Sequence, residues 1–228
     1  MANNFPSNPL PKWRAVGFDL DDTLFDRRAA LARLMVKWLG ATEAAGSMTE
    51  VLERDGCGQA VREEFHEWLA GRFPALGGDA KLVARHFRRD FPGCVRPDAD
   101  TIRVLARLKA AGIKMAILSN GTEATQYAKL RACGAASYFP RHCVLISAAF
   151  GFPKPDPRAF GALAEALEIA PAEILFVGDD PRRDIAGARE AGLPTCRLRR
   201  PGRCPCEPEA DMVIDSLADL LSLPRLPK

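Results

Sequence analysis

The sequence lacks any long hydrophobic run. No stretch of about 18 or more apolar residues occurs in its 228 residues, so a transmembrane helix is not expected. The opening Met-Ala-Asn-Asn-Phe-Pro has neither the basic start nor the apolar centre of a signal peptide. We therefore expect a cytoplasmic protein with no membrane partner.

A large excess of one charge is also missing. The 32 Lys and Arg residues nearly balance the 29 Asp and Glu residues, which leaves a formal net charge of +3. Charges that nearly cancel create no strong field to steer a polyanion toward the surface. Nucleic acid is therefore not an expected partner.

The cysteine count gives no sign of a disulfide framework. Seven cysteines are scattered through a chain that is expected to be cytoplasmic, so free thiols are favoured. Cys204 and Cys206 lie near Cys196 in the sequence, but this spacing is not a strong zinc pattern and a fourth ligand is missing. We favour a structural or adventitious pair, and the sequence leaves any other role of Cys204 and Cys206 open.

Short apolar runs alternate with amphipathic segments of helical length over most of the chain. The expected strands are residues 15–18, 113–118, 143–146, 174–177, 194–198 and 212–214. Between them, residues 157–167 follow helical spacing behind Asp156 as the N-cap. The predicted fold class is α/β, a Rossmann-like parallel sheet with helices on both faces.

Residues 26–96 interrupt this alternation. They show helical patterns, no convincing strand, and breaks at two glycine pairs, 56/58 and 77/78. We expect them to form a small α-helical cap domain inserted after the first strand, with residues 1–25 and 97–228 as the α/β core domain. Because the insertion leaves and re-enters the sheet around the first strand, it should cover the carboxyl end of the sheet.

Polar residues stand where four of the predicted strands end. Asp19, Ser119 and Asp179 follow strands at once, and Lys154 follows another after a short loop. Ligands of open parallel sheets bind beyond the carboxyl ends of the strands, so these side chains should converge. Carboxylates, a hydroxyl and an ammonium are the groups that hold a divalent cation and a phosphate. A bound Mg²⁺ would also remove the repulsion between crowded carboxylates.

Four short motifs resemble, in the same order, those of the haloacid dehalogenase (HAD) superfamily. They are Asp19-Leu20-Asp21-Asp22-Thr23-Leu24, Ser119-Asn120-Gly121, Lys154-Pro155-Asp156-Pro157, and Gly178-Asp179-Asp180 with Asp184. The resemblance spans residues 15–199, and residues 26–96 lie where this superfamily places its cap. The cap itself carries no recognised motif.

The resemblance implies a phosphatase mechanism. Asp19 would attack phosphorus and form an aspartyl-phosphate. Asp21 would protonate the leaving group and then take a proton from water. Ser119, Asn120 and Lys154 would bind the phosphoryl group.

The resemblance also implies a Mg²⁺ site. The ligands would be the carboxylates of Asp19 and Asp179 and the carbonyl of Asp21. Asp180 and Asp184 are candidates for contact through water or for a supporting position around the ligands. Asp180 also precedes Pro181, which is the pattern of a helix N-cap.

Three other functions stay open. A 2-haloacid dehalogenase would use the same nucleophile on carbon, but relatives of that kind carry a different residue in the place of Asp21. A sugar-phosphate mutase keeps both aspartates and depends on its cap to exclude water. A non-catalytic protein that binds a phosphorylated ligand is disfavoured because every expected catalytic group is present.

The favoured interpretation is a Mg²⁺-dependent phosphoric monoester hydrolase that acts on a small phosphorylated metabolite. The leaving group would be selected by side chains of the cap, and one sequence does not show which of them face inward. The sequence leaves the identity of the substrate open, and equally whether the protein is a monomer or a homodimer.

Overall fold

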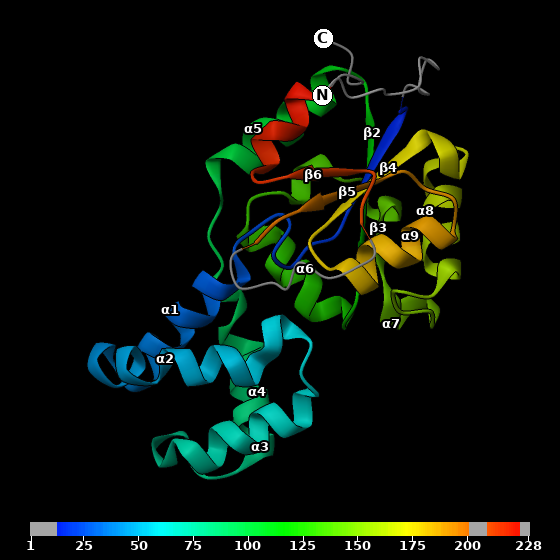
Figure 1. The fold of residues 1–228 in the computed structure, drawn as a ribbon. Coiled ribbons are helices and arrows are strands. Elements are labelled where there is room, and N and C mark those ends of the chain that lie inside the picture. Colours follow the sequence, from blue (N-terminus) through cyan, green and yellow to red (C-terminus); the bar gives the residue numbers. More distant parts are fainter. Residues whose placement is uncertain (1–12, 201–208, 224–228) are drawn as a thin grey trace, which may run out of the picture.

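The computed structural model describes residues 13–200 and 209–223. Its centre is a sheet of six parallel strands in the order β3-β2-β1-β4-β5-β6 (Figure 1). The strands are β1 Ala15–Phe18, β2 Lys114–Ser119, β3 Val144–Ile146, β4 Ile174–Gly178, β5 Thr195–Leu198 and β6 Met212–Ile214. The α/β class predicted from the sequence is confirmed, and each expected strand agrees with the observed one to within one residue at either end.

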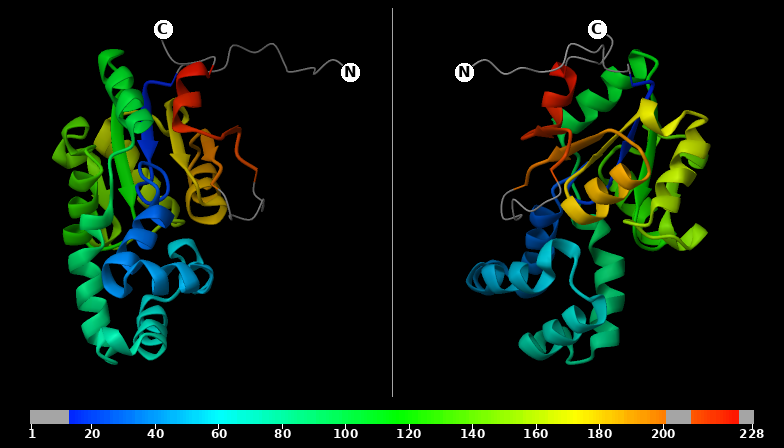
Figure 2. Two further views of the ribbon diagram at one scale, coloured as in Figure 1. Left: turned by 90° about the vertical axis from the view of Figure 1, so that its left-hand side faces the viewer. Right: turned by 45° about the vertical axis from the view of Figure 1, so that its right-hand side comes forward.

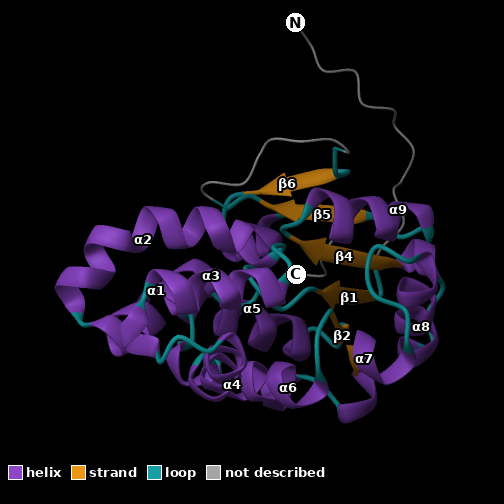
Figure 3. Cartoon of the chain, turned by 90° about the horizontal axis from the view of Figure 1, so that it is seen from below, coloured by secondary structure: helices purple, strands orange, loops and turns teal. Residues whose placement is uncertain are grey.

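Helices cover both faces of the sheet. They are α5 Ala99–Ala110, α6 Glu123–Ala132, α7 Ser147–Phe150, α8 Pro157–Leu167 and α9 Gly187–Glu190. The side chains of α5 and α6 belong to one buried cluster and those of α8 and α9 to another. Figure 3 shows α8 and α9 on the opposite side of the strands from α5 and α6. Along β1, Val16 and Phe18 join the first cluster and Ala15 the second, because successive side chains of a strand point to opposite faces.

Four further helices lie between β1 and β2 in the chain. They are α1 Arg27–Leu39, α2 Ala41–Asp55, α3 Arg62–Arg72 and α4 Ala80–Asp90, and residues 27–90 contain no strand. We call residues 27–90 the helical lobe. Both views of Figure 2 place it beyond the end of the sheet where β1 runs into α1. The helical content predicted for this stretch is therefore observed.

Local capping signals set the starts and ends of several helices. Asp156 accepts a hydrogen bond from the backbone N–H of Arg158 at 2.9 Å, with Pro157 as the first helical residue, so the predicted cap is confirmed. Helix α5 begins at Ala99, because Asp98 accepts from the N–H of Thr101 and caps the helix. After α5, Gly112 has φ +71°, the left-handed conformation that closes a helix.

The cysteines of the described ranges carry no disulfide. All five are free thiols: Cys57, Cys94, Cys133, Cys143 and Cys196. Cys204 and Cys206 lie outside the described residues, so the interpretation of that pair stays a prediction. In the described part of the chain, no helix combines the length and the apolarity needed to cross a bilayer.

Candidate active site

Three neighbouring strands carry candidate residues at their carboxyl ends. Asp19 follows β1 and donates its backbone N–H to Val177 of β4 at 2.9 Å. Ser119 is the last residue of β2, and Asp179 directly follows β4. Because β1 lies between β2 and β4 in the sheet, these ends adjoin. The side chains of Asp19, Ser119 and Asp179 are all buried, and the structure brings them together as the strand-end argument predicts.

A cluster of three buried carboxylates forms the floor of the site. One oxygen each of Asp19, Asp179 and Asp184 lies within 4.8 Å of the others. Lys154 places its Nζ 2.5 Å from Asp19 Oδ1 and 2.7 Å from Asp184 Oδ1. The Lys154 side chain is buried as well. The ammonium thus contacts two of the three carboxylates, and carboxylates gathered this closely form a site that favours a cation.

Asp184 reaches the cluster because of two local features. It lies in a π-helical turn, Pro181–Ala186, and its Oδ2 accepts the backbone N–H of Asp180 at 3.0 Å. Opposite it stands Gly178, where an added Cβ would lie only 2.4 Å from the Asp184 carboxylate. The absence of a side chain at Gly178 therefore makes room for this carboxylate.

The neighbouring Asp180 lines the same cavity but is not one of the three clustered carboxylates. Its Oδ1 accepts the N–H groups of Arg182 and Arg183 at 2.9 and 3.0 Å, which makes it the N-cap that Pro181 predicts. Its Oδ2 accepts the side-chain amide of Gln59 in the helical lobe at 2.5 Å. Of the two aspartates that the sequence left open, Asp184 thus faces the cluster and Asp180 binds the helix start and the lobe.

Asn120 supports the loop that carries Lys154. Its Nδ2 donates to the Lys154 carbonyl and its Oδ1 accepts the Lys154 backbone N–H, both at 2.9 Å. These two bonds join the nitrogen and the oxygen of the Asn120 side-chain amide to the backbone of Lys154. Asn120 therefore fixes the backbone of Lys154, whose ammonium lies in the carboxylate cluster beside Asp19.

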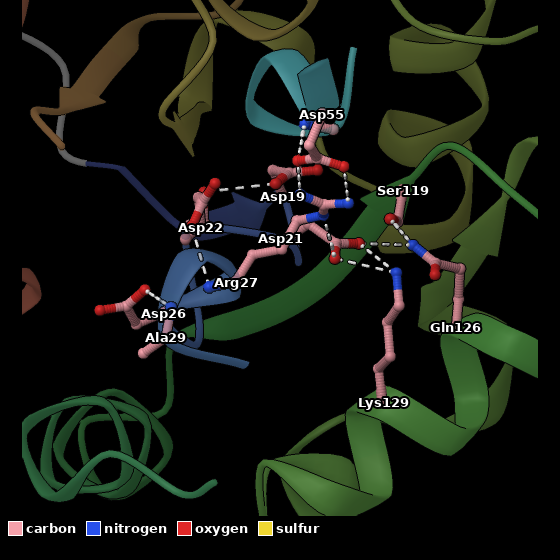
Figure 4. A network of polar contacts seen from close by, with 12 residues as sticks. Asp19, Asp21, Asp22, Asp26, Arg27, Ala29, Asp55, Ser119, Gln126 and Lys129 are labelled. Atoms are coloured by element: carbon pink, nitrogen blue, oxygen red, sulfur yellow. Dashed lines mark hydrogen bonds and ion pairs between the residues drawn. The ribbon is translucent and has the colours of Figure 1, made fainter. Parts of the chain in front are cut away.

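Asp21 is surrounded by side chains that the sequence did not single out (Figure 4). Lys129 Nζ lies 2.8 and 2.9 Å from its two carboxylate oxygens, and Gln126 Nε2 donates to Oδ2 at 3.0 Å. Arg27 Nε lies 3.7 Å from Oδ1. Gln126 also donates to Ser119 Oγ at 2.5 Å. A signal for two of them was present, because residues 126 and 129 are spaced to share one face of a helix that follows Ser119.

The two aspartates of the first motif differ in proton affinity. Burial raises the pKa of Asp19 to about 7, opposed by the charge of Lys154 and reinforced by that of Asp184. Burial would also raise the pKa of Asp21, but the charges of Lys129 and Arg27 outweigh it and hold the value below its usual range. Asp19 thus holds a proton more readily than Asp21. A cation bound at the cluster would favour the ionised form of Asp19.

A cavity of about 1060 Å³ opens above these residues. Its floor includes Asp19, Asp21, Ser119, Lys154 and Asp179, and its lobe side includes Gln59, Arg62, His66, Lys81 and Arg88. His66 is buried, and within the described ranges its Nε2 has no hydrogen-bond partner. Burial and the charges of Arg62 and Arg88 lower the pKa of His66. The lobe thus presents polar and charged side chains to the space above the carboxylate cluster.

The fold and the site define a class: a Rossmann-like α/β protein with a buried acidic site at the carboxyl edge of its sheet. A family model described as haloacid dehalogenase-like hydrolase matches residues 13–192. The chain therefore belongs to the haloacid dehalogenase-like hydrolases, and the resemblance recognised in the four motifs is confirmed.

Known relatives include enzymes acting on phosphorus and on carbon. The chain is 31% identical over 230 residues to a glyceraldehyde 3-phosphate phosphatase of Methanopyrus kandleri, covering 93% of this chain and 97% of the relative. It is 40% identical over 152 residues to a phosphoserine phosphatase of Thermus thermophilus, covering 67% of this chain and 57% of the relative. The solved L-2-haloacid dehalogenase of Xanthobacter autotrophicus is 26% identical with a TM-score of 0.68, over 92% and 98% of the two chains. Family membership alone therefore leaves the reacting atom undecided.

Proposed function

We propose that the protein hydrolyses a small phosphomonoester with the help of Mg²⁺, through an aspartyl-phosphate on Asp19. The observation that carries this proposal is the Asp19 carboxylate, buried beside Lys154 and grouped with Asp179 and Asp184 under a cavity. Two similar proteins are named as phosphatases of small phosphorylated metabolites, which supports the same chemistry here.

The donor set suits Mg²⁺. The ion prefers oxygen ligands, and the cluster offers oxygens from three carboxylates. We assign the site to Asp19, Asp179 and the Asp21 carbonyl, with Asp184 as a further candidate ligand or a support of the others. When bound, the ion would neutralise charge on the cluster and on the phosphoryl oxygens.

In the first half of the reaction, an oxygen of Asp19 forms a bond to phosphorus while the ester P–O bond breaks. Lys154 would bind phosphoryl oxygens by charge and Ser119 by hydrogen bonding. Protonated Asp21 would give its proton to the leaving alkoxide. The products of this half are an alcohol and the phosphorylated Asp19.

In the second half, water attacks the phosphorus of the aspartyl-phosphate. Asp21 would take a proton from that water, and the bond between phosphorus and the Asp19 oxygen would break. Inorganic phosphate leaves, and the Asp19 carboxylate is restored. Asp21 is then protonated again for the next turnover.

We also propose that residues 26–96 act as the cap domain and residues 1–25 and 97–228 as the core domain. Gln59 joins the lobe to Asp180, and His66 and Arg88 line the cavity from the lobe. Groups at this position face the part of a substrate that extends beyond the phosphate, so they would select the leaving group. The substrate would therefore be a small phosphorylated metabolite that fits between lobe and sheet.

Asp21 favours phosphorus over carbon as the reacting atom. A departing halide needs no proton, whereas a departing alkoxide does. The Asp21 carboxylate lines the same cavity as Asp19 and Lys154, where it can reach a leaving group. Dehalogenase chemistry has no leaving group for this carboxylate to protonate.

The test is Mg²⁺-dependent phosphate release from p-nitrophenyl phosphate. We expect Asp19→Asn and a chelator to abolish the release, while the control Asp100→Asn, at a half-exposed position of α5, keeps the wild-type rate. Chloride release from 2-chloropropionate should be absent. Equal phosphate release by wild type and Asp19→Asn would overturn the proposal, and so would chloride release without phosphatase activity. A mutase would pass the phosphoryl group to a second sugar hydroxyl and release little phosphate.

A further inference from the structure

Asp21 has to present its carboxylate to a water molecule in the second half of the proposed reaction. We propose that Lys129 and Gln126 of α6 are positioning residues that hold the Asp21 carboxylate as the proton acceptor for that water and tie it to Ser119. This inference rests on the proposed function.

Lys129 contacts the Asp21 carboxylate through both of its oxygens. The Lys129 ammonium lies 2.8 and 2.9 Å from the two carboxylate oxygens. It therefore holds the carboxylate at two points, whereas a hydrogen bond to one oxygen would hold it at one. Lys129 is only 9% exposed, and its Nζ lies 5.3 Å from the centre of the Phe91 ring. The Arg27 guanidinium lies over the same ring at 5.5 Å. Both cations beside Asp21 are therefore packed in place instead of moving in solvent.

Gln126 joins Asp21 to the phosphate-binding candidate Ser119. An ionised carboxylate can only accept hydrogen bonds, so the amide nitrogen of Gln126 must face Asp21. The same nitrogen donates to Ser119 Oγ. Because this bond uses a lone pair of the hydroxyl, the Ser119 hydrogen stays available for a phosphoryl oxygen. One amide thus orders the proton acceptor and the phosphate binder together (Figure 4).

The burial of Gln126 and Lys129 is not well explained by a purely structural role. Gln126 is 3% exposed and Lys129 9%, although polar side chains of a surface helix normally turn to solvent. Both side chains line the cavity. A buried ion pair contributes little net stability when compared with apolar residues of the same volume. The contacts are better explained by their effect on Asp21.

The role predicts which half of the reaction depends on Lys129. p-Nitrophenolate leaves without a proton, so formation of the aspartyl-phosphate from p-nitrophenyl phosphate needs no help from Asp21. The attacking water must lose a proton to Asp21 as the bond between phosphorus and Asp19 breaks. Loss of the positioning contacts should therefore slow the second half and spare the first.

The experiment compares wild type with Lys129→Met and Gln126→Met in steady-state and rapid-mixing kinetics with p-nitrophenyl phosphate and Mg²⁺. For each variant we expect kcat to fall at least about tenfold and KM to fall in parallel, since positioned bases contribute about 100-fold or more. The ratio kcat/KM should hold within about twofold. A burst of p-nitrophenolate equal to the enzyme concentration should precede steady turnover. Arg131→Met, an exposed residue of the same helix, is the control and should show none of these changes.

A merely structural role would lower kcat/KM and give no burst. That result, or an unchanged kcat in both variants, would overturn the inference while wild-type activity still supported the proposed function. If wild type itself shows no phosphate release that depends on Asp19, the proposed function fails and the inference fails with it. Thermal unfolding checks the fold, and if Lys129→Met does not fold, Gln126→Met decides the outcome.

Discussion

The guanidinium of Arg27 forms an ion pair with both carboxylate oxygens of Asp55, joining the start of α1 to the end of α2. Asp55 also binds Arg62 at 3.0 Å and the backbone N–H of Gly58 at 2.8 Å. Asp55 therefore anchors the turn that carries Gln59 toward Asp180. Arg27 and Asp55 are both buried, which makes the pair sensitive to the loss of one partner.

Asp55→Asn should destabilise the protein by about 3 kcal/mol at neutral pH, because it leaves Arg27 buried without its counter-charge. Burial opposes ionisation of Asp55, but Arg27 and Arg62 outweigh it and lower its pKa. A pKa below the unfolded value of about 3.9 contributes stability that is complete above about pH 4 and is lost as the pH falls through the folded-state value.

The free energy of unfolding from urea titrations should therefore differ most between wild type and Asp55→Asn at neutral pH. The difference should shrink progressively below about pH 4. Asp100→Asn, at a half-exposed position of α5, is the control. A difference that stays constant down to strongly acidic pH would contradict this account of the pair.

Lys154→Met should reveal the charge imbalance of the carboxylate cluster. Without the ammonium, Asp19 and Asp184 repel each other, so the variant should unfold at a lower temperature than wild type. Mg²⁺ should raise the melting temperature of the variant more than that of wild type, because the cation replaces the lost charge and binds only the folded state. Phosphate release should fall at least about 100-fold. Equal Mg²⁺ shifts in wild type and variant, with the exposed Lys109→Met as control, would show that the cluster does not depend on Lys154.

Asp184→Ala and Asp180→Ala should separate metal binding from helix capping. Titration calorimetry should show at least about tenfold weaker Mg²⁺ binding for Asp184→Ala, whether it is a ligand or supports one. Asp180→Ala should keep the Mg²⁺ affinity within about threefold and lose about 1 kcal/mol of stability, because it removes an N-cap. The reverse pattern would place Asp180 at the metal in place of Asp184.

Arg88→Ala should change which phosphoesters are preferred. Arg85 and Arg88 are both exposed residues of α4, but only Arg88 belongs to the cavity lining. Across a panel of phosphorylated metabolites, the ratios of kcat/KM should shift by about fivefold or more for Arg88→Ala. Arg85→Ala should reproduce the wild-type profile. Identical kcat/KM profiles for both variants would show that Arg88 does not contribute to substrate selection.

The sheet could be predicted because its strands are short apolar runs separated by turns and helices. Phe18 is buried on one face of the sheet and Phe176 on the other, so the hydrophobic pattern follows directly from the fold. The positions of Asp19, Ser119 and Asp179 then follow from the rule that parallel strands share one carboxyl edge.

Contacts between side chains of distant segments could not be predicted in the same way. Lys129 and Asp21 are 108 residues apart in the sequence, and their contact depends on how α6 packs against the sheet. Asp184 reaches the cluster through a π-helical turn opposite Gly178, and hydrophobic periodicity does not encode such a turn. No signal in the sequence indicated that the Asn120 side chain would bind the backbone of Lys154, and its role at the phosphate stays a prediction.

The most direct test of the account is chemical trapping of the phosphorylated residue. Wild-type protein would be mixed with Mg²⁺ and p-nitrophenyl phosphate, quenched in acid, reduced with borohydride and analysed by peptide mass spectrometry. An acyl phosphate is reduced to an alcohol, so the account predicts homoserine at position 19, at no other aspartate, and not in Asp19→Asn. Phosphate release with position 19 unmodified would contradict the assignment of Asp19 as the nucleophile.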